Sequence, residues 1–161
     1  MRDAGAMLGR RSVLESVVVD FLLVANHVEV VNGLLYVSGG GWTEHRRPLT
    51  PQGPALSHLG IGVSVLVPWT ATNQPHTLTI LVEDEDATPV LKIDGQFNVG
   101  RPPTLPAGAE QPVLLGFPLN VQFPHAGTYR AIATVDADGA SKHWTFRVYD
   151  MPVQGPGQQV L

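Results

Sequence analysis

Apolar residues along this chain recur mostly with a period of two, or in short runs bounded by Gly, Pro, Asn or Asp. The alternation is clearest in Ile61–Val67, His76–Val82 and Tyr129–Val135. A period of two places successive side chains on opposite faces of an extended strand. No segment shows a convincing helical spacing. The pattern therefore predicts an all-β chain of about eight to ten short strands.

The first strands predict a tight hairpin. The apolar runs Val17–Val24 and Val28–Val31 are followed by Asn32-Gly33 and then by Leu34–Ser38. An Asn-Gly pair between two apolar runs favours a two-residue turn, because both central positions of that turn need positive φ. The glycine string before Trp42 predicts a bend, after which Thr43–Arg47 continues outward.

Small residues line one face of the next strand. Between Ala55 and Trp69, the residues Gly60, Gly62 and Ser64 alternate with an apolar set. Side chains this small allow another layer to lie close to that face.

Turn signals divide the rest of the chain. We expect a loop at Pro48–Pro54 and turns at Pro68–Pro75, Glu83–Asp86 and Asp94-Gly95. Short return strands are expected at Val90–Ile93 and Gln96–Val99, followed by an extended connector at Arg101–Gln111. The next strand, Val113–Phe123, contains Pro118 and should therefore be an edge strand or a bulged one.

The last two strands suggest the architecture. Tyr129 begins the penultimate strand after a Pro-x-x-Gly corner, which resembles the tyrosine corner of immunoglobulin-type sandwiches. Trp144, Phe146 and Val148 alternate on the strand that returns after Asp138-Gly139. The prediction is a two-layer antiparallel β-sandwich that is immunoglobulin-like, although a chain without Cys is no true antibody domain.

Length and composition narrow the function classes. The 161 residues predict one domain over residues 17–150, with a flexible leader at 1–16 and a flexible tail at 151–161. The absence of Cys excludes disulfides and thiolate metal sites. A net charge of −4 with only two Lys offers no basic face for nucleic acid. We expect no membrane-spanning segment and a cytoplasmic location.

Candidate chemistry is sparse. The six His (His27, His45, His58, His76, His125 and His143) have no metal-binding spacing, so a site would require distant strands to meet. The acidic run Glu83–Asp86, with Asp94 and the pair Asp136 and Asp138, lacks the ligand order of a calcium loop and is typical of a solvated turn. The neighbours Ser57 and His58 would point to opposite faces of a strand. We therefore predict no catalytic, cofactor-binding or metal-binding residues, and no enzyme.

Most of the eleven aromatic residues are expected in the core, while Trp42 and Trp69 are the candidates for a contact surface. Only 15% of residues are charged, and neither Val17–Val24 nor Ile61–Val67 contains a basic residue to protect a strand edge. The leading hypothesis is a structural or protein-interaction module that forms a homo-oligomer or binds another protein. The alternative is a small-ligand or carbohydrate-binding module, less favourably a hydrolase, with a cleft near Gly39–Trp42.

A family resemblance is based on specific segments. The stretch Val19–Ala25, the string Leu35-Tyr36-Val37-Ser38-Gly39-Gly40-Gly41-Trp42 and the closing Phe117–Leu119, Phe123–Tyr129 and Asp138-Gly139 resemble a bacterial, actinobacterial-type family catalogued as a domain of unknown function. The resemblance spans about residues 17 to 150 and implies a sandwich fold and a bacterial origin. It implies no activity, cofactor or catalytic residue.

Overall fold

A computed structural model describes residues 16–137 and 140–151. These residues form strands and one 3-10 turn, with no α-helix among them. The elements are β1 (Val18–Val31), β2 (Leu34–Gly40), β3 (Glu44–Arg47), β4 (Leu49–Thr50), β5 (Gly53–Pro54), β6 (Ser57–Val67), η2 (Trp69–Ala71), β7 (Pro75–Asp84), β8 (Pro89–Asn98), β9 (Gln111–Val121), β10 (Gly127–Val135) and β11 (Ser141–Asp150). The predicted leader and tail lie outside the described residues, except for Ser16 and Met151.

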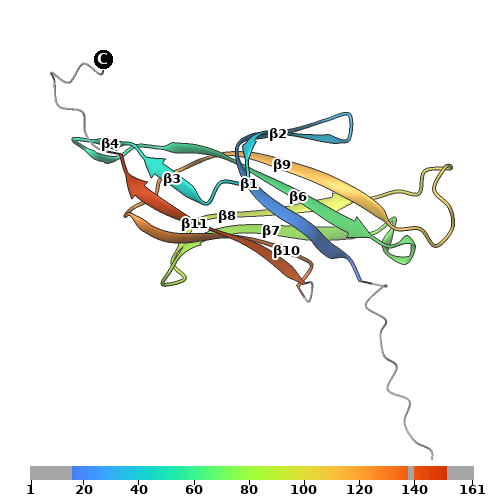
Figure 1. Cartoon of the computed structure of the whole chain (residues 1–161). Helices are drawn as coiled ribbons and strands as arrows, with labels where there is room; N and C mark the ends of the chain where they lie inside the picture. The colour runs from blue at the N-terminus through green and yellow to red at the C-terminus, as the bar shows by residue number, and fades with distance from the viewer. Residues whose placement is uncertain (1–15, 138–139, 152–161) are drawn as a thin grey trace, which may run out of the picture.

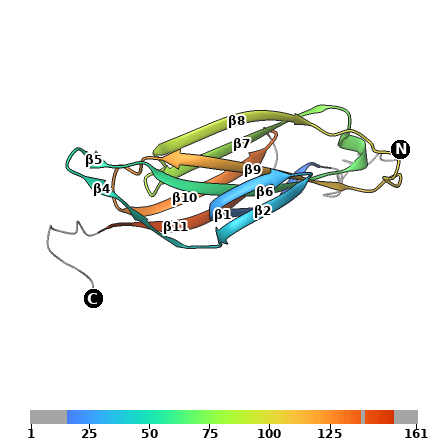
Figure 2. The same cartoon turned by 90° about the horizontal axis from the view of Figure 1, so that it is seen from above.

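Two sheets face each other, as Figure 1 shows. Sheet A has the strand order β2-β1-β6-β9, and sheet B has the order β3-β11-β10-β7-β8. A short β4–β5 hairpin projects from one end of the molecule (Figure 2). The all-β, two-layer prediction is confirmed, and its immunoglobulin-like detail stays a prediction.

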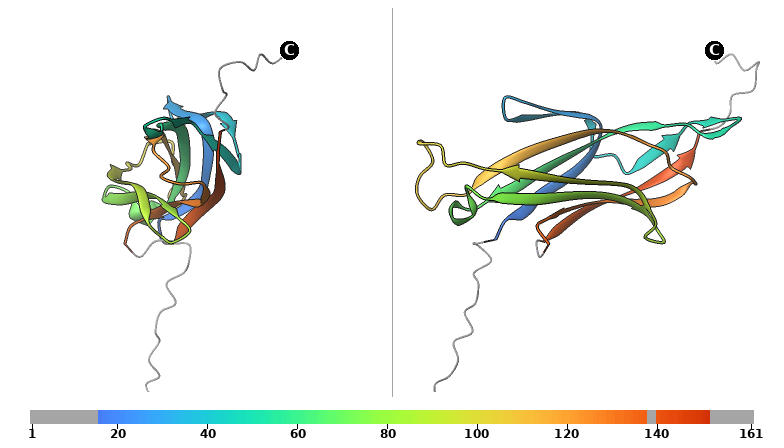
Figure 3. Two further views of the ribbon diagram at one scale, coloured as in Figure 1. Left: turned by 90° about the vertical axis from the view of Figure 1, so that its left-hand side faces the viewer. Right: turned by 180° about the vertical axis from the view of Figure 1, so that it is seen from behind.

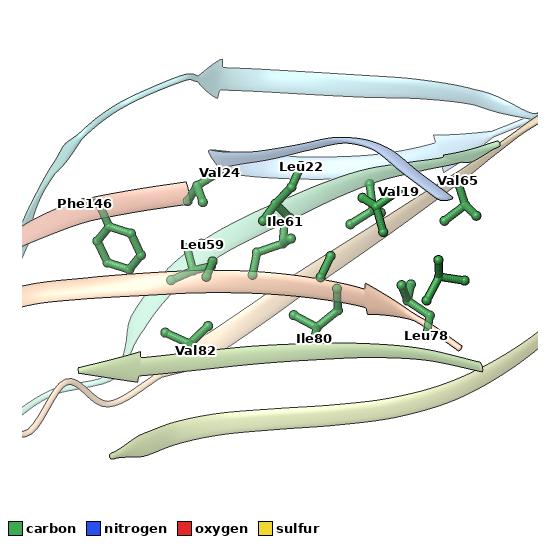
Figure 4. Close-up of a cluster of buried hydrophobic side chains, with 14 of the residues drawn as sticks. Val19, Leu22, Val24, Leu59, Ile61, Val65, Leu78, Ile80, Val82 and Phe146 are labelled. Atoms are coloured by element: carbon green, nitrogen blue, oxygen red, sulfur yellow. The ribbon is translucent and has the colours of Figure 1, made fainter. Parts of the chain in front are cut away.

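The core fills the space between the sheets (Figure 4). It follows the alternation of the sequence, because every second residue of a strand faces the opposite sheet. The largest fully buried side chains include Leu59, Ile61, Val63, Val65 and Val67 of β6, Ile80 and Val82 of β7, and Tyr129 of β10. The inward faces assigned from the sequence to β6, β7 and β10 are thus confirmed.

One pair of strands departs from the antiparallel prediction. β3 runs parallel to β11, with Glu44 opposite Arg147 and Arg47 opposite Asp150. The chain crosses from sheet A to sheet B between β2 and β3, and β3 enters sheet B alongside β11 in the same direction (Figure 3). Side-chain periodicity is the same in parallel and antiparallel strands, so the sequence pattern did not reveal this pair.

β1 is one strand of 14 residues rather than the two predicted runs. It changes partner at Ala25, which pairs with Gly60 of β6 on one side and with Gly40 of β2 on the other. The polar residues Asn26 and His27, which suggested a break, lie where one ladder ends and the other continues. β1 stays extended through this change because it pairs with β6 up to Ala25 and with β2 from Ala25 onward.

Other local predictions were wrong. The expected turn at Asp94-Gly95 is absent, because β8 continues through it with Gly95 opposite Leu78 and the Asp94 carboxylate accepting a hydrogen bond from Thr79 (2.7 Å). The expected loop Pro48–Pro54 contains the β4–β5 hairpin, whereas the expected turn Pro68–Pro75 is confirmed and contains η2. Whether such a segment forms a strand or a turn depends on the strand that pairs with it, and a local sequence pattern does not reveal that partner.

Candidate functional site

The β1–β2 hairpin is the most distinctive surface feature. Asn32 and Gly33 have φ of 50° and 75°, and Val31 pairs with Leu34 across the turn. Two consecutive positive φ values define the tight turn that Asn-Gly favours, so the predicted hairpin is confirmed. Figure 3 shows the hairpin, in blue, lying above the other strands of sheet A.

The inner side of the hairpin lies on the outer face of sheet A, above three glycines. A Cβ added to Gly60 would lie 2.6 Å from the Val28 backbone nitrogen, and one added to Gly62 would lie 3.1 Å from a Leu35 methyl carbon. At Gly116 the same atom would lie 3.4 Å from a methyl carbon of Val30. The predicted close layer on this face is confirmed, and it is the hairpin itself.

The hairpin also carries exposed apolar side chains. Val31, Leu34 and Tyr36 point away from sheet A, whereas Val30 and Val37 point to the side that faces it. Five of the eight large hydrophobic residues found exposed among the described residues belong to it, and we call these five the hairpin patch: Val30 (37% exposed), Val31 (44%), Leu34 (58%), Tyr36 (51%) and Val37 (41%). A concentration of exposed apolar side chains on one element is typical of a contact surface.

The free edge of β2 is also unprotected. β2 pairs only with β1, so its other edge presents unpaired backbone N–H and C=O groups. Its sequence contains no charged residue and no Pro, the features that usually prevent edge-to-edge pairing. The other edge strands of sheets A and B carry such residues: Asp20 in the first half of β1, Glu44 and Arg46 in β3, Pro89, Lys92 and Asp94 in β8, and Pro112 and Pro118 in β9.

The two runs whose lack of basic residues suggested an unprotected strand edge do not provide that edge. Ile61–Val67 is central, because β6 pairs with β1 and β9. Val17–Val24 pairs with β6 on one side, and the exposed carboxylate of Asp20 lies within it. The unprotected edge is that of β2, which sequence reasoning did not select.

Tyr36 was also missed, because it was assigned to the core with most other aromatic residues. A signal was present in the sequence: four consecutive apolar residues at 34–37 do not alternate, so one face of this strand has to carry apolar side chains away from the core.

The glycine string before Trp42 does not enclose an obvious cleft. A Cβ at Gly39 would lie 2.3 Å from the Asn26 side-chain nitrogen, and one at Gly40 would lie 2.6 Å from a Val37 methyl carbon. Side chains of the hairpin therefore fill the space beside two of the three glycines.

The predicted contact residues Trp42 and Trp69 are both half-buried. Trp42 packs edge-on against Phe146 with 5.3 Å between ring centroids, and the Arg101 guanidinium lies 4.4 Å from the ring centroid of Trp69. Each indole is thus engaged by residues of this chain.

The structure does not bring the two tryptophans together. Gly41, next to Trp42, donates a backbone hydrogen bond to Val24 of β1 (2.8 Å). Trp69 instead follows the end of β6, where Leu66 pairs with Val18 of β1. Six residues of β1 separate these points, which corresponds to about 20 Å along a strand.

The acidic run is partly buried rather than a solvated turn, which corrects that interpretation. Glu83 and Asp84 belong to β7 and are only 6% and 8% exposed. Glu83 forms an ion pair with Arg130. Among the described residues, no three His, Asp or Glu side chains gather to hold a metal ion; Asp138 lies outside them.

Asp84 shapes its turn. Its Oδ1 accepts hydrogen bonds from the backbone N–H groups of Asp86 and Thr88, both at 2.9 Å, and its Oδ2 lies 3.2 Å from Nε2 of His125. The bond from Thr88 is the main cause of a lowered Asp84 pKa. The pKa of His125 is raised, chiefly by its bond to the Ala126 carbonyl and then by Asp84.

Two of the six histidines lie side by side although 31 residues separate them. His27 Nδ1 is 3.5 Å from His58 Nε2, and the rings stack with 5.8 Å between centroids. Ser57 is buried while His58 is exposed, so these neighbours point to opposite faces, as predicted.

A shallow polar hollow lies on the outer face of sheet B. Its volume is about 680 Å³, and it is lined by Thr77, Thr79, Asp94, Gly95, Gln96, Thr134, Asp136 and Ala137. The carboxylates of Asp94 and Asp136 accept hydrogen bonds within the chain, from the Thr79 hydroxyl and the Thr77 backbone N–H respectively. Both carboxylates thus already have hydrogen-bond partners within the chain.

A comparison with protein families gives a match. The sequence model of a family of unknown function (DUF6941) matches residues 20–149, which include the hairpin and most of both sheets. No curated protein matches the chain. Within the described part of the chain, no helix is long and apolar enough to span a membrane.

Proposed function

The chain belongs to the family of unknown function DUF6941, and we propose that it is a non-enzymatic protein-interaction module that self-associates through the β1–β2 hairpin. The observation that carries this proposal is the coincidence of two features on one strand. β2 has the unprotected edge of sheet A, and it also contributes three of the five residues of the hairpin patch.

The two features favour association in different ways. A free strand edge supplies backbone hydrogen bonds to an added strand, which set the direction of pairing. The hairpin patch supplies apolar area, which contributes free energy in proportion to the surface removed from water. A partner strand placed beside β2 would use both features at once.

A second copy of this chain is the partner that we propose. In a two-fold dimer the same surface faces itself, so each copy has to offer both an edge and an apolar patch. The hairpin offers both within residues 30–37. The edge strand β2 itself carries no charge, and the nearest charged side chain of the hairpin is Glu29 of β1, opposite Tyr36.

The alternative of a small-ligand or carbohydrate-binding module, or of a hydrolase, has less support. Side chains of Asn26 and Val37 fill the space beside Gly39 and Gly40, where a cleft was expected. We also propose a bacterial, cytoplasmic protein that binds no nucleic acid. The two Lys and the net charge of −4 support the absence of a nucleic-acid partner, and the family resemblance supports a bacterial origin.

Light scattering across a dilution series tests self-association. We expect a mass of about twice the 17.3 kDa of one chain at high concentration, decreasing on dilution. The double variant Leu34→Lys and Tyr36→Lys should remain at 17.3 kDa, because it places two charges on the hairpin edge.

Leu56→Lys is the matched control. Leu56 is 64% exposed and lies outside the hairpin, so its substitution should leave the mass of the assembly unchanged. Both side chains of the double variant are more than half exposed, so its melting temperature should stay close to that of the original chain. A mass of 17.3 kDa for the original chain at every concentration would overturn the proposal.

A further inference from the structure

We propose that His27 and His58 form a two-imidazole site for a first-row divalent transition metal, Zn²⁺, Ni²⁺ or Cu²⁺, on the outer face of sheet A. This site is independent of the proposed self-association, because it lies within one chain and includes no residue of the hairpin patch.

The path of β1 beyond its ladder with β6 places the two rings. The ladder ends where Ala25 pairs with Gly60, and beyond it the backbone of His27 passes over Gly60, next to His58. His58 pairs with Asn120 of β9, and residues directly opposite in a ladder point to the same side. The three side chains therefore lie on the outer face of sheet A, with the imidazole of His27 against that of His58.

The distance between the two nitrogens fits a shared metal better than a direct hydrogen bond. His27 Nδ1 and His58 Nε2 are 3.5 Å apart. Hydrogen bonds between nitrogen donors and their acceptors usually span about 2.7–3.2 Å. Two nitrogens bound to one tetrahedral metal at about 2.05 Å would be about 3.3 Å apart. The observed separation is therefore about 0.2 Å longer than the one that a shared tetrahedral metal requires.

Asn120 orients one of the ligands. Its Oδ1 lies 3.2 Å from Nδ1 of His58, so Nδ1–H can donate to the amide oxygen. This arrangement leaves the lone pair on Nε2, the nitrogen that faces His27. Metal-binding histidines commonly donate their second ring N–H to an oxygen in this way, which fixes the tautomer and the ring direction.

The donor set determines which metals fit. Neutral imidazole nitrogens suit Zn²⁺, Cu²⁺ and Ni²⁺, whereas Ca²⁺ and Mg²⁺ require oxygen ligands. Both histidines are exposed, so water can occupy the remaining coordination positions. No group of three His, Asp or Glu forms among the described residues, so the site has two protein ligands and should bind more weakly than a structural zinc site.

Binding should stabilise the fold locally. His27 lies where β1 leaves its ladder with β6 to enter the hairpin, and a metal would link that point to β6. A ligand that binds only the folded chain raises the melting temperature with its concentration.

The test uses the full chain without an affinity tag, freed of metal by a chelator. Titration calorimetry with ZnCl₂ should show one metal per chain, and Cu²⁺ electron paramagnetic resonance should show coupling to two imidazole nitrogens. His27→Ala and His58→Ala should each abolish the two-nitrogen signal, while Asn120→Ala should weaken binding about tenfold or more.

His143→Ala is the matched control, because His143 is an exposed histidine on β11 of the other sheet. It should leave affinity and spectrum unchanged. Zn²⁺ should also raise the melting temperature of the original chain and of His143→Ala, but not that of His27→Ala. The proposal is overturned if no metal binds, or if His27→Ala and His58→Ala, still folded by circular dichroism, bind as the original chain does.

Discussion

The hydroxyl of Tyr129 donates a hydrogen bond of 2.7 Å to the carbonyl oxygen of His125, four residues earlier. The Tyr129 residue is fully buried, and its ring packs edge-on against Phe123 with 4.8 Å between centroids. Burial is the main cause of a raised Tyr129 pKa. This bond closes the corner that precedes β10.

Tyr129→Phe should therefore lower the free energy of unfolding by about 1 kcal/mol. The variant keeps the ring packing but leaves the His125 carbonyl oxygen without its side-chain donor. Urea denaturation measures the difference. Tyr149→Phe, at an exposed position on β11, is the control and should be near neutral. Equal stability of both variants would show that the corner bond contributes nothing.

Gly33→Val should destabilise the chain by more than about 1 kcal/mol. Gly33 has φ of 75°, which a β-branched residue resists, while no atom lies within 4 Å of an added Cβ. The cost is thus conformational rather than a steric clash. Gly95→Val is the control, because Gly95 also has open space but lies in a strand without positive φ. Thermal melting should separate the two, and unchanged melting of Gly33→Val would contradict the turn.

Gly60→Ala should destabilise the hairpin by about 1–3 kcal/mol, as overpacking does. The new Cβ would meet the backbone of Val28 at 2.6 Å, and backbone cannot move aside as a flexible side chain can. Hydrogen exchange of the β1–β2 amides should become faster. Gly116→Ala is the control, since its nearest contact would be an ordinary 3.4 Å. Equal exchange in both variants would mean that the hairpin does not pack closely on β6.

The ion pair of Asp84 and His125 predicts a pH dependence. A lowered Asp84 pKa contributes stability above the ordinary value of 3.8, which is lost as pH falls through the folded value. A raised His125 pKa contributes stability below the ordinary value of 6.5, which is lost as pH rises through the folded value. The contribution of the pair is therefore largest between those two ordinary values.

His125→Gln should reduce the loss of stability as the pH rises above 6.5, measured by urea denaturation at several pH values. His143→Gln, on the exposed face of β11, is the control and should keep the original pH profile. A profile unchanged by His125→Gln would show that this pair does not affect folding.

The sequence by itself determined the strands and their inward faces. The alternation in Leu78, Ile80 and Val82 is visible locally, because a strand repeats every two residues and the core excludes polar side chains. The Asn32-Gly33 turn was equally local, since its backbone angles depend on the two residues that form it. These features need no knowledge of the rest of the chain.

Only the tertiary structure decided which strands became neighbours and which edges stayed free. Val17–Val24 and Leu34–Ser38 both appear as apolar strands, yet the first carries an exposed Asp on its free edge and the second has an unprotected one. The meeting of His27 and His58 depended in the same way on the path of β1 over β6 beyond their ladder. Strand pairing joins residues far apart in the chain through backbone groups that are the same in nearly every residue. Side-chain patterns therefore determine which way a strand faces, whereas its partners depend on the packing of the whole sandwich.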